Sequence, residues 1–151
     1  MKKALLVLLL VSTSLFADAI YSLTLKQNSN TVYNKLMASL ADNHLVVVSE
    51  IDILAKFKQA GLPAKFADEF NTNNLTAIKA IIACNGYFGN YISNEDPKMM
   101  ALCPIRITLY EKAGETTIVY VKPTSVMADT KASEMIVKLE AQVIKAIEAA
   151  K

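Results

Sequence analysis

The 151-residue sequence has no tryptophan, only four glycines and four prolines, and two cysteines. With so little glycine and proline and 53% hydrophobic residues, it is not a collagenous, low-complexity or disordered chain. A phosphate-binding loop is also excluded, because Gly86 and Gly89 form neither a G-x-G-x-x-G nor a G-K-[ST] pattern. At this length, a single domain is expected.

Basic residues exceed acidic residues by only two. The net charge is +2, from 16 basic and 14 acidic residues. Without Lys2 and Lys3, which lie in a leader described below, the two counts are equal. Nucleic-acid affinity rests on clustered lysine and arginine, and no stripe of basic and aromatic residues occurs. We therefore expect no nucleic-acid partner.

The N-terminus has the pattern of a secretory signal peptide. Lys2 and Lys3 precede an apolar run over 4–11, and small residues follow at Ala17 and Ala19. The run is shorter than the ~20 apolar residues that span a bilayer, although an uncleaved anchor is the alternative. We predict a signal peptide over 1–19, cleaved after residue 17 or 19, and a periplasmic domain over 20–151 without a stable membrane span.

Hydrophobic periodicity predicts an alternation of strands and helices in this domain. Strands are expected over 20–25, 45–51, 75–83, 105–111 and 116–121, and helices over 31–42, 53–60 and from 129 or 130 to the end. For 75–83, length and β-branched residues favour the strand, and the periodicity does not exclude a helix. Ser29 or Asn30 would cap the first helix, Gly61 would end the second, and 112–115 favours a hairpin. Segment 64–71 is a helical turn or a loop, and 85–93 is weakly helical at best. The predicted fold is α+β, a single-domain two-layer sandwich with helices on one face of a mainly antiparallel or mixed sheet.

The two cysteines, Cys84 and Cys103, are the main candidates for chemistry. In an exported chain, an even cysteine count favours a disulfide, which would enclose ~20 residues and contribute roughly 3 kcal/mol of stability. In the alternative, both cysteines are soft ligands that, with Met99 or Met100, hold Cu(I) or contact haem iron. Thiol exchange is a third interpretation, but the cysteines do not form a C-x-x-C motif.

His44 and Arg106 each occur as the only residue of their type. His44 lies between a helix and a strand, where capping or surface exposure is favoured over catalysis. A zinc site would need it to meet both cysteines in the fold. Arg106 either anchors a ligand carboxylate or pairs with a nearby acid such as Glu111, and we favour the pairing. No nucleophile and base are marked by spacing, so we do not expect an enzyme.

Two segments carry a resemblance to a known family. Ala83-Cys84-Asn85 and the run from Leu102 through Cys103-Pro104-Ile105-Arg106-Ile107 to Tyr110-Glu111 resemble the bacterial domain of unknown function 302 family. The resemblance extends through 46–52, Gly61 and 119–123, and covers most of 29–149. It implies a small α+β domain that tends to dimerise and has no agreed enzymatic activity. Many relatives have proline before the cysteine and a histidine where this chain has Ile53-Leu54.

These observations predict an exported, non-catalytic binding or accessory domain that forms a homodimer and contains a disulfide between Cys84 and Cys103. The alternative is a redox, metal- or haem-handling protein. Arg106, Asn85 and His44 are the candidate binding residues. No motif in the sequence identifies a small ligand or a cofactor.

Overall fold

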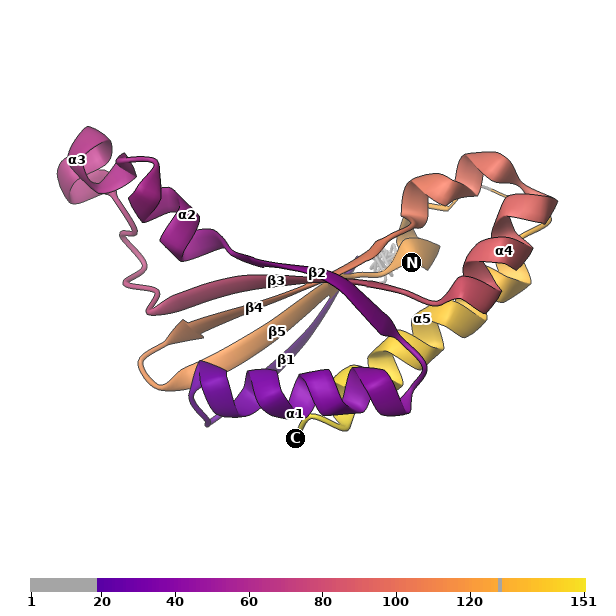
Figure 1. Ribbon diagram of the computed structural model, residues 1–151, viewed down its shortest axis with the longest axis horizontal. Coiled ribbons are helices and arrows are strands. Elements are labelled where there is room, and N and C mark those ends of the chain that lie inside the picture. Colours follow the sequence, from indigo (N-terminus) through magenta and orange to yellow (C-terminus); the bar gives the residue numbers. More distant parts are fainter. Residues whose placement is uncertain (1–18, 128) are drawn as a thin grey trace, which may run out of the picture.

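The computed structural model describes residues 19–127 and 129–151 (Figure 1). The predicted signal peptide lies outside the described residues except for Ala19. The elements, in chain order, are β1 (Ile20–Leu25), α1 (Ser29–Asp42), β2 (Val46–Asp52), α2 (Ile53–Gln59), α3 (Leu62–Phe66), the 3-10 segment η1 (Ala67–Glu69), β3 (Ala77–Cys84), α4 (Gly86–Glu95), η2 (Pro97–Leu102), β4 (Ile105–Lys112), β5 (Glu115–Val121), η3 (Pro123–Ser125) and α5 (Ser133–Glu148).

The five strands form one sheet in the order β1-β5-β4-β3-β2. All four neighbouring pairs are antiparallel. The predicted α+β architecture is confirmed, and the choice between an antiparallel and a mixed sheet is settled in favour of the first. The predicted hairpin is a two-residue turn at Ala113 and Gly114, whose φ angles of 52° and 78° match the twist of the flanking strands.

Helices α1 and α5 cover one face of the sheet. Val32, Leu36 and Leu40 recur at four-residue spacing on the buried side of α1. The buried stripe of α5 consists of Ile136, Leu139, Val143, Ala146 and Ile147. Alternate residues of the strands meet these helices, and Ile107, Leu109 and Ile118 are fully buried there. This layer is the hydrophobic core.

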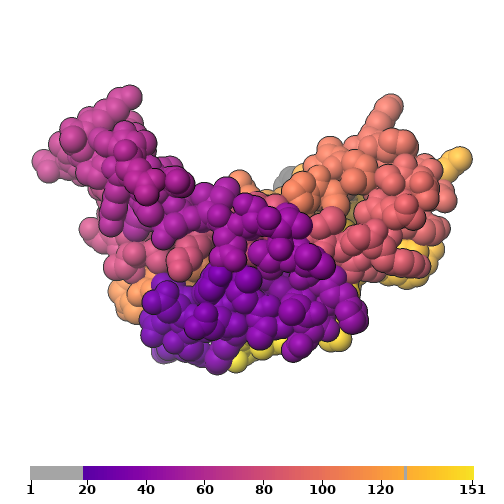
Figure 2. All heavy atoms as spheres, in the orientation of Figure 1, coloured from indigo at the N-terminus to yellow at the C-terminus, as the bar shows by residue number. Residues whose placement is uncertain are grey.

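The opposite face of the sheet lies between two raised ends (Figure 1). Helices α2 and α3 rise at one end, and α4 with η2 rises at the other. The space-filling view shows a hollow in the surface between them (Figure 2). We call this surface the open face, and we call the two raised ends the α2–α3 arm and the α4–η2 arm.

The cap of α1 and the extent of α4 differ from the sequence-based prediction. Asn28, not Ser29 or Asn30, caps α1, because its side chain accepts a hydrogen bond from the Thr31 N–H. Segment 85–93 forms a full helix, α4, although it contains two glycines. Asn85 caps α4 and α4 packs on α5, which offsets the low helix propensity of glycine. Gly61 ends α2 with φ of 72°, as predicted.

Glu111 ties the start of α1 to the sheet. Its Oε2 accepts a hydrogen bond of 2.8 Å from the backbone N–H of Ser29, the first residue of α1. Hydrogen bonds from the Ser29 side chain and backbone lower the pKa of Glu111 below its ordinary value of 4.5. A carboxylate is also stabilised by the positive end of a helix dipole. The ionised form of Glu111 therefore stabilises the fold.

We expect Glu111→Gln to lower the free energy of unfolding at pH 7 by about 0.5 kcal/mol, through loss of this charge. A depressed pKa contributes stability above the unfolded value of 4.5, and that stability is lost as the pH falls through the folded pKa. The difference between the variant and the wild type in urea unfolding should therefore shrink as the pH falls below 4.5 and vanish once Glu111 is protonated in the folded state. Glu115→Gln, at the exposed end of the hairpin, should show no such difference, and a pH-independent gap for Glu111→Gln would contradict this account.

Candidate functional site

The fold brings the two cysteines together. Cys84 is the last residue of β3, and Cys103 directly precedes Pro104 at the start of β4. Both are partly buried, and no disulfide joins them in this structure. Cys84 lies close enough to Cys103 to raise the pKa of its thiol. The α4–η2 arm therefore leaves the sheet at one cysteine and returns to it at the other.

Burial makes Cys103 a poor nucleophile at neutral pH. Burial, and next the neighbouring Cys84, raise the pKa of the Cys103 thiol from 9.0 to about 11. Reactive cysteines in thiol-exchange proteins have lowered pKa values, because the thiolate is the attacking species. The environment of Cys103 is therefore typical of a structural cysteine rather than of an exchange catalyst.

The methionines beside Cys103 differ in burial. Met99 is half-buried and packs against the hydrophobic core, whereas Met100 is exposed. His44 lies at the turn after α1, with φ of 57°, and its backbone N–H donates to the Ala41 carbonyl. It thus occupies the capping and surface position that its sequence context favours. Among the described residues, no three His, Cys, Asp or Glu side chains gather at metal-binding distance, so His44 does not join the cysteines.

Asn85 follows Cys84 and uses its side chain within the fold. Its Oδ1 accepts from the N–H groups of Tyr87 and Phe88 at the start of α4. Its Nδ2 donates to Gln142 on α5, and the Gln142 amide donates in turn to the Asn43 carbonyl at the end of α1. Asn85 is 8% exposed and links three helices behind the cysteine pair. In this structure its role is to position α4.

Arg106 does not pair with Glu111, so the interpretation favoured from the sequence is wrong. The two residues are five apart on β4, and strand alternation places them on opposite faces of the sheet. Glu111 is engaged by Ser29, while Arg106 is exposed on the open face. Over the residues that the structure describes, Arg106 makes no ion pair, and only Lys138 and Glu134 form one. The remaining interpretation is an arginine free to bind an anion.

Strand register defines the residues of the open face. Cross-strand partners form the rows Thr24, Thr117, Tyr110 and Ile78; Ser22, Val119, Thr108, Ala80 and Ile51; and Ile20, Val121, Arg106, Ile82 and Ser49. A hydrogen bond of 2.9 Å between the Thr24 and Thr117 hydroxyls confirms that these two side chains lie on the same face of the sheet. Arg106 is the one charged residue in these three rows, and the next pair on this face, at the hairpin end, is Lys112 with Glu115. Cys84 continues the alternate positions of Ala80 and Ile82 to the end of β3.

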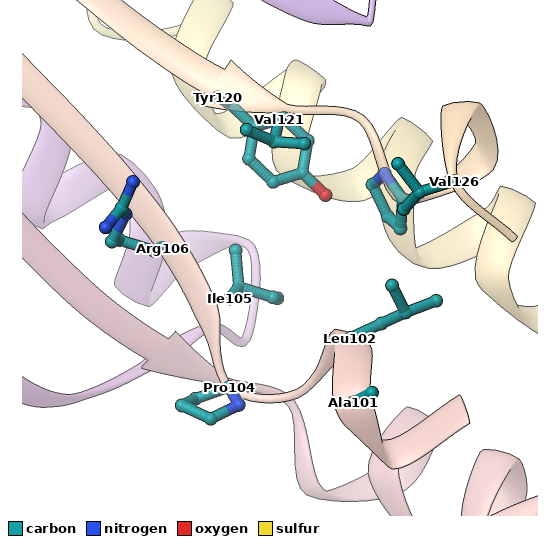
Figure 3. A pocket seen from close by; sticks show the side chains of 9 residues that line it. Ala101, Leu102, Pro104, Ile105, Arg106, Tyr120, Val121 and Val126 are labelled. Atoms are coloured by element: carbon teal, nitrogen blue, oxygen red, sulfur yellow. The ribbon is translucent and has the colours of Figure 1, made fainter. Parts of the chain in front are cut away.

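The third row is broken between Val121 and Arg106. The β4–β5 ladder stops at the pair Ile107 and Tyr120, while β4 stays paired with β3 and β5 with β1. A pocket with a cavity volume of about 190 Å³ lies where the two strands separate (Figure 3). We call it the fork pocket. Tyr120 and Arg106 both line it.

Tyr120 is a residue of this region that sequence reasoning did not single out. Its side chain is 3% exposed, and within the described chain its hydroxyl has no hydrogen-bond partner. By contrast, the hydroxyls of Tyr21 and Tyr33 donate to Glu148 and Glu50. Burial, and next the charge of Glu140, raise the pKa of Tyr120 above its ordinary value, so the hydroxyl stays protonated. Its alternation in β5 predicts only that it points inward.

The α2–α3 arm carries a second, apolar pocket of about 260 Å³. It is lined mainly by Leu54, Phe57, Leu62, Phe66, Phe70 and Ile78. Ile78 also belongs to the first row of the open face, so the apolar surface of the sheet continues onto this arm. Phe57 and Phe66 are exposed at its edge.

Fold and site together define a small antiparallel α+β domain with a cysteine pair at one end of an uncovered sheet face. The chain belongs to the family described as Domain of unknown function DUF302, which matches residues 21–150. It is similar in fold to the crystal structure of an uncharacterized conserved protein DUF302 from Bacillus stearothermophilus, with 20% sequence identity and a TM-score of 0.77. That match covers 89% of this chain and 100% of the other. No curated protein matches the sequence.

Proposed function

We propose that this protein is an exported, non-catalytic binding or accessory domain that works as a homodimer, with its open face as the dimer interface and a disulfide between Cys84 and Cys103. The carrying observation is the open face itself. In its three rows, Arg106 is the one charge, whereas Ile20, Ile51 and Val121 are exposed apolar side chains. An exposed apolar surface of this kind marks an interaction site.

The dimensions of the open face fit a partner that also contacts the arms. Five strands about 4.8 Å apart and roughly six residues long span about 24 by 20 Å, or some 480 Å². A stable interface buries about 800 Å² on each partner. The two arms and the apolar pocket below Phe57 and Phe66 would supply the remainder. None of the helices in 19–127 and 129–151 is long and apolar enough to cross a membrane.

A second copy of the chain is the partner that suits this shape. The face is hollowed along the long axis between the two arms (Figure 2). Two copies related by a two-fold axis and crossed at an angle place the sheet of each between the arms of the other. A symmetric interface requires one self-complementary patch, and a nearly uncharged sheet face meets that condition because like charges do not oppose each other. The family resemblance also implies dimers.

The side chains capable of acid–base chemistry are mostly engaged in structure. The carboxylates of Asp52 and Asp96 accept backbone N–H groups at the starts of α2 and η2, and Glu111 does so at α1. His44 lies at a turn. These placements support a binding role rather than catalysis.

The cysteine pair supports the proposed disulfide. Export places the chain in an oxidising compartment, the two thiols interact, and the raised pKa of Cys103 suits a structural rather than an exchanging cysteine. Closing the ~20-residue arm would stabilise the fold by roughly 3 kcal/mol.

We expect protein recovered from the periplasm of an expressing bacterium to have the intact mass of a chain that begins at residue 18 or 20, lower by the two thiol hydrogens. Reductant should lower its melting temperature by roughly 10 °C. The Cys84→Ser variant should show no such response to reductant. A full-length mass would contradict export with cleavage, and two free thiols in the cleaved form would contradict the bridge alone.

We expect the wild-type domain to sediment as a dimer and Val119→Lys to sediment as a monomer. Val119 lies in the central row of the open face, where a buried lysine would lack a partner. The matched control is Val137→Lys, because Val137 is 49% exposed on α5, away from the sheet. It should remain dimeric. A monomeric wild type, or a dimeric Val119→Lys, would refute the interface.

A second candidate function is soft-metal or haem handling by Cys84, Cys103 and Met99 or Met100. The contact between the thiols favours it, because two thiolates can hold Cu(I), and half-buried Met99 is the better placed thioether. Under this alternative, the reduced protein should compete with a chromophoric chelator for Cu(I), Cys103→Ser should abolish competition and Met100→Leu should preserve it. For the haem version, added haem should give a shifted absorption band. Neither signal would appear in a protein whose cysteines are purely structural.

A further inference from the structure

The fork pocket is a gap within an otherwise continuous sheet. Ile105 and Arg106 belong to β4, and Val121 belongs to β5, yet the ladder between these strands stops at Ile107 and Tyr120. The backbone edges of the separated strand ends therefore face the pocket without pairing to each other. Polar backbone groups that leave a ladder need other partners, which a ligand can provide.

The walls of the fork pocket are apolar. They come from the end of η2, the residues that begin β4 and end β5, and the segment around η3 (Figure 3): Ala101, Leu102, Pro104, Ile105, Val121, Pro123 and Val126. The cavity of about 190 Å³ is equivalent to about six water molecules in the liquid. It is smaller than the pockets that hold drug-sized ligands, which start near about 300 Å³. The space suits a short aliphatic body.

Tyr120 supplies a hydrogen-bond donor at the base of the pocket. In Figure 3 its ring extends from β5 and the hydroxyl points into the space between Leu102 and Val126. A buried hydroxyl without a partner costs free energy, which a ligand acceptor would recover. The nearby charge of Glu140 disfavours an anion at this point, because like charges repel. The matching group on a ligand is therefore a neutral carbonyl or hydroxyl oxygen.

Arg106 supplies a cation at the edge of the same pocket. It is exposed and, in the described chain, is held by no carboxylate. Its guanidinium is planar and binds carboxylates through two parallel hydrogen bonds. Figure 3 shows the side chain extending from β4 on the far side of Ile105 from Leu102, so in the monomer an anion it binds stays near solvent, and in the proposed dimer it lies at the end of the open face.

We propose that the fork pocket binds a small oxo- or hydroxycarboxylate. The short aliphatic body lies between the separated strands, its neutral oxygen accepts the Tyr120 hydroxyl, and its carboxylate meets Arg106 outside. The Tyr120 hydroxyl is covered in the unliganded protein, so side chains at the mouth move when the ligand enters. Val126, 61% exposed, has room to do so. This proposal gives the proposed binding role a ligand class. It rests on the proposed function only for the assumption that the domain binds its ligand without reacting with it.

The test uses three probes of similar size. 4-Oxopentanoate carries both polar groups, pentanoate lacks the ketone, and 2-pentanone lacks the carboxylate. Each is titrated into the mature domain and followed by the amide NMR shifts of residues around the pocket. We expect 4-oxopentanoate to bind most tightly. Loss of either group should weaken binding roughly threefold or more, the effect of one neutral hydrogen bond or one exposed ion pair.

Two variants separate the contributions. Tyr120→Phe should weaken 4-oxopentanoate and 2-pentanone by about threefold to tenfold and leave pentanoate unchanged. Arg106→Gln should weaken the two carboxylates roughly threefold and leave 2-pentanone unchanged. Tyr110→Phe, on the same sheet but outside the pocket, is the control and should bind all three probes as the wild type does.

Stability of the free protein gives a second measurement. A tyrosine whose buried hydroxyl has no partner can lose it without cost, so the melting temperature of Tyr120→Phe should equal or exceed that of the wild type. A clear decrease would show that the hydroxyl has a protein partner, and would overturn the proposal. Equal binding of the three probes, or shifts away from the pocket, would overturn it as well.

The monomeric Val119→Lys variant distinguishes this proposal from the proposed dimer. Its pocket residues are unchanged, so it should bind the uncharged probe 2-pentanone like the wild type, whereas the new lysine lies on the face of Arg106 and would itself attract a carboxylate. Failure of dimerisation with normal probe binding would remove the dimer and keep the ligand site. A wild-type dimer that binds none of the probes would remove the ligand site and keep the dimer.

Discussion

The structure depends on burial of one face of the sheet by two helices. Side chains alternate along a strand, so once Ile107, Leu109 and Ile118 lie under α1 and α5, every neighbour is committed to the other side. A slip of one residue would expose the core, and this fixes the register of all five strands. The open face, with its rows of small and apolar residues, is the direct result. The chemistry of the open face is therefore set by the alternate side chains of each strand that point away from α1 and α5.

Both ends of the sheet depend on specific hydrogen bonds. At one end, the Gln142 side chain accepts a hydrogen bond from Asn85 and donates one to the Asn43 carbonyl. These two bonds join α4, α5 and α1. At the start of α1, Glu111 receives the first helical N–H. Polar groups that are buried and fully paired define a single arrangement, whereas Tyr120 is buried and unpaired. That contrast is why the fork pocket, rather than the Asn85 cluster, is open to a ligand.

Most of the fold could be predicted from the sequence, because the longest helices have a clear apolar stripe and the strands have either alternating residues or short runs rich in β-branched residues. It failed at α4, where Gly86 and Gly89 weaken the local signal and tertiary packing with the Asn85 cap decides the outcome. The meeting of Cys84 and Cys103 could be proposed from their number, but their contact depends on β3 and β4 being neighbours. The predicted pairing of Arg106 with Glu111 was wrong, because the two side chains lie on opposite faces of the sheet. The fork and Tyr120 were unpredictable, because the end of a ladder depends on how two strands diverge in space.

The α4–η2 arm is closed at its base. Cys84 and Cys103 meet where it joins the sheet, and the Thr130 hydroxyl donates to Asp96 at its far side, which ties it to the segment before α5. The strands β3 and β4 pair below it without any contribution from its own residues. Residues 86–102 thus take no part in the strand pairing, although Ile92 anchors them in the hydrophobic core. Because Ala101 and Leu102 from the same segment line the fork pocket, a substitution at either residue would change the walls of the pocket and leave every strand pair in place.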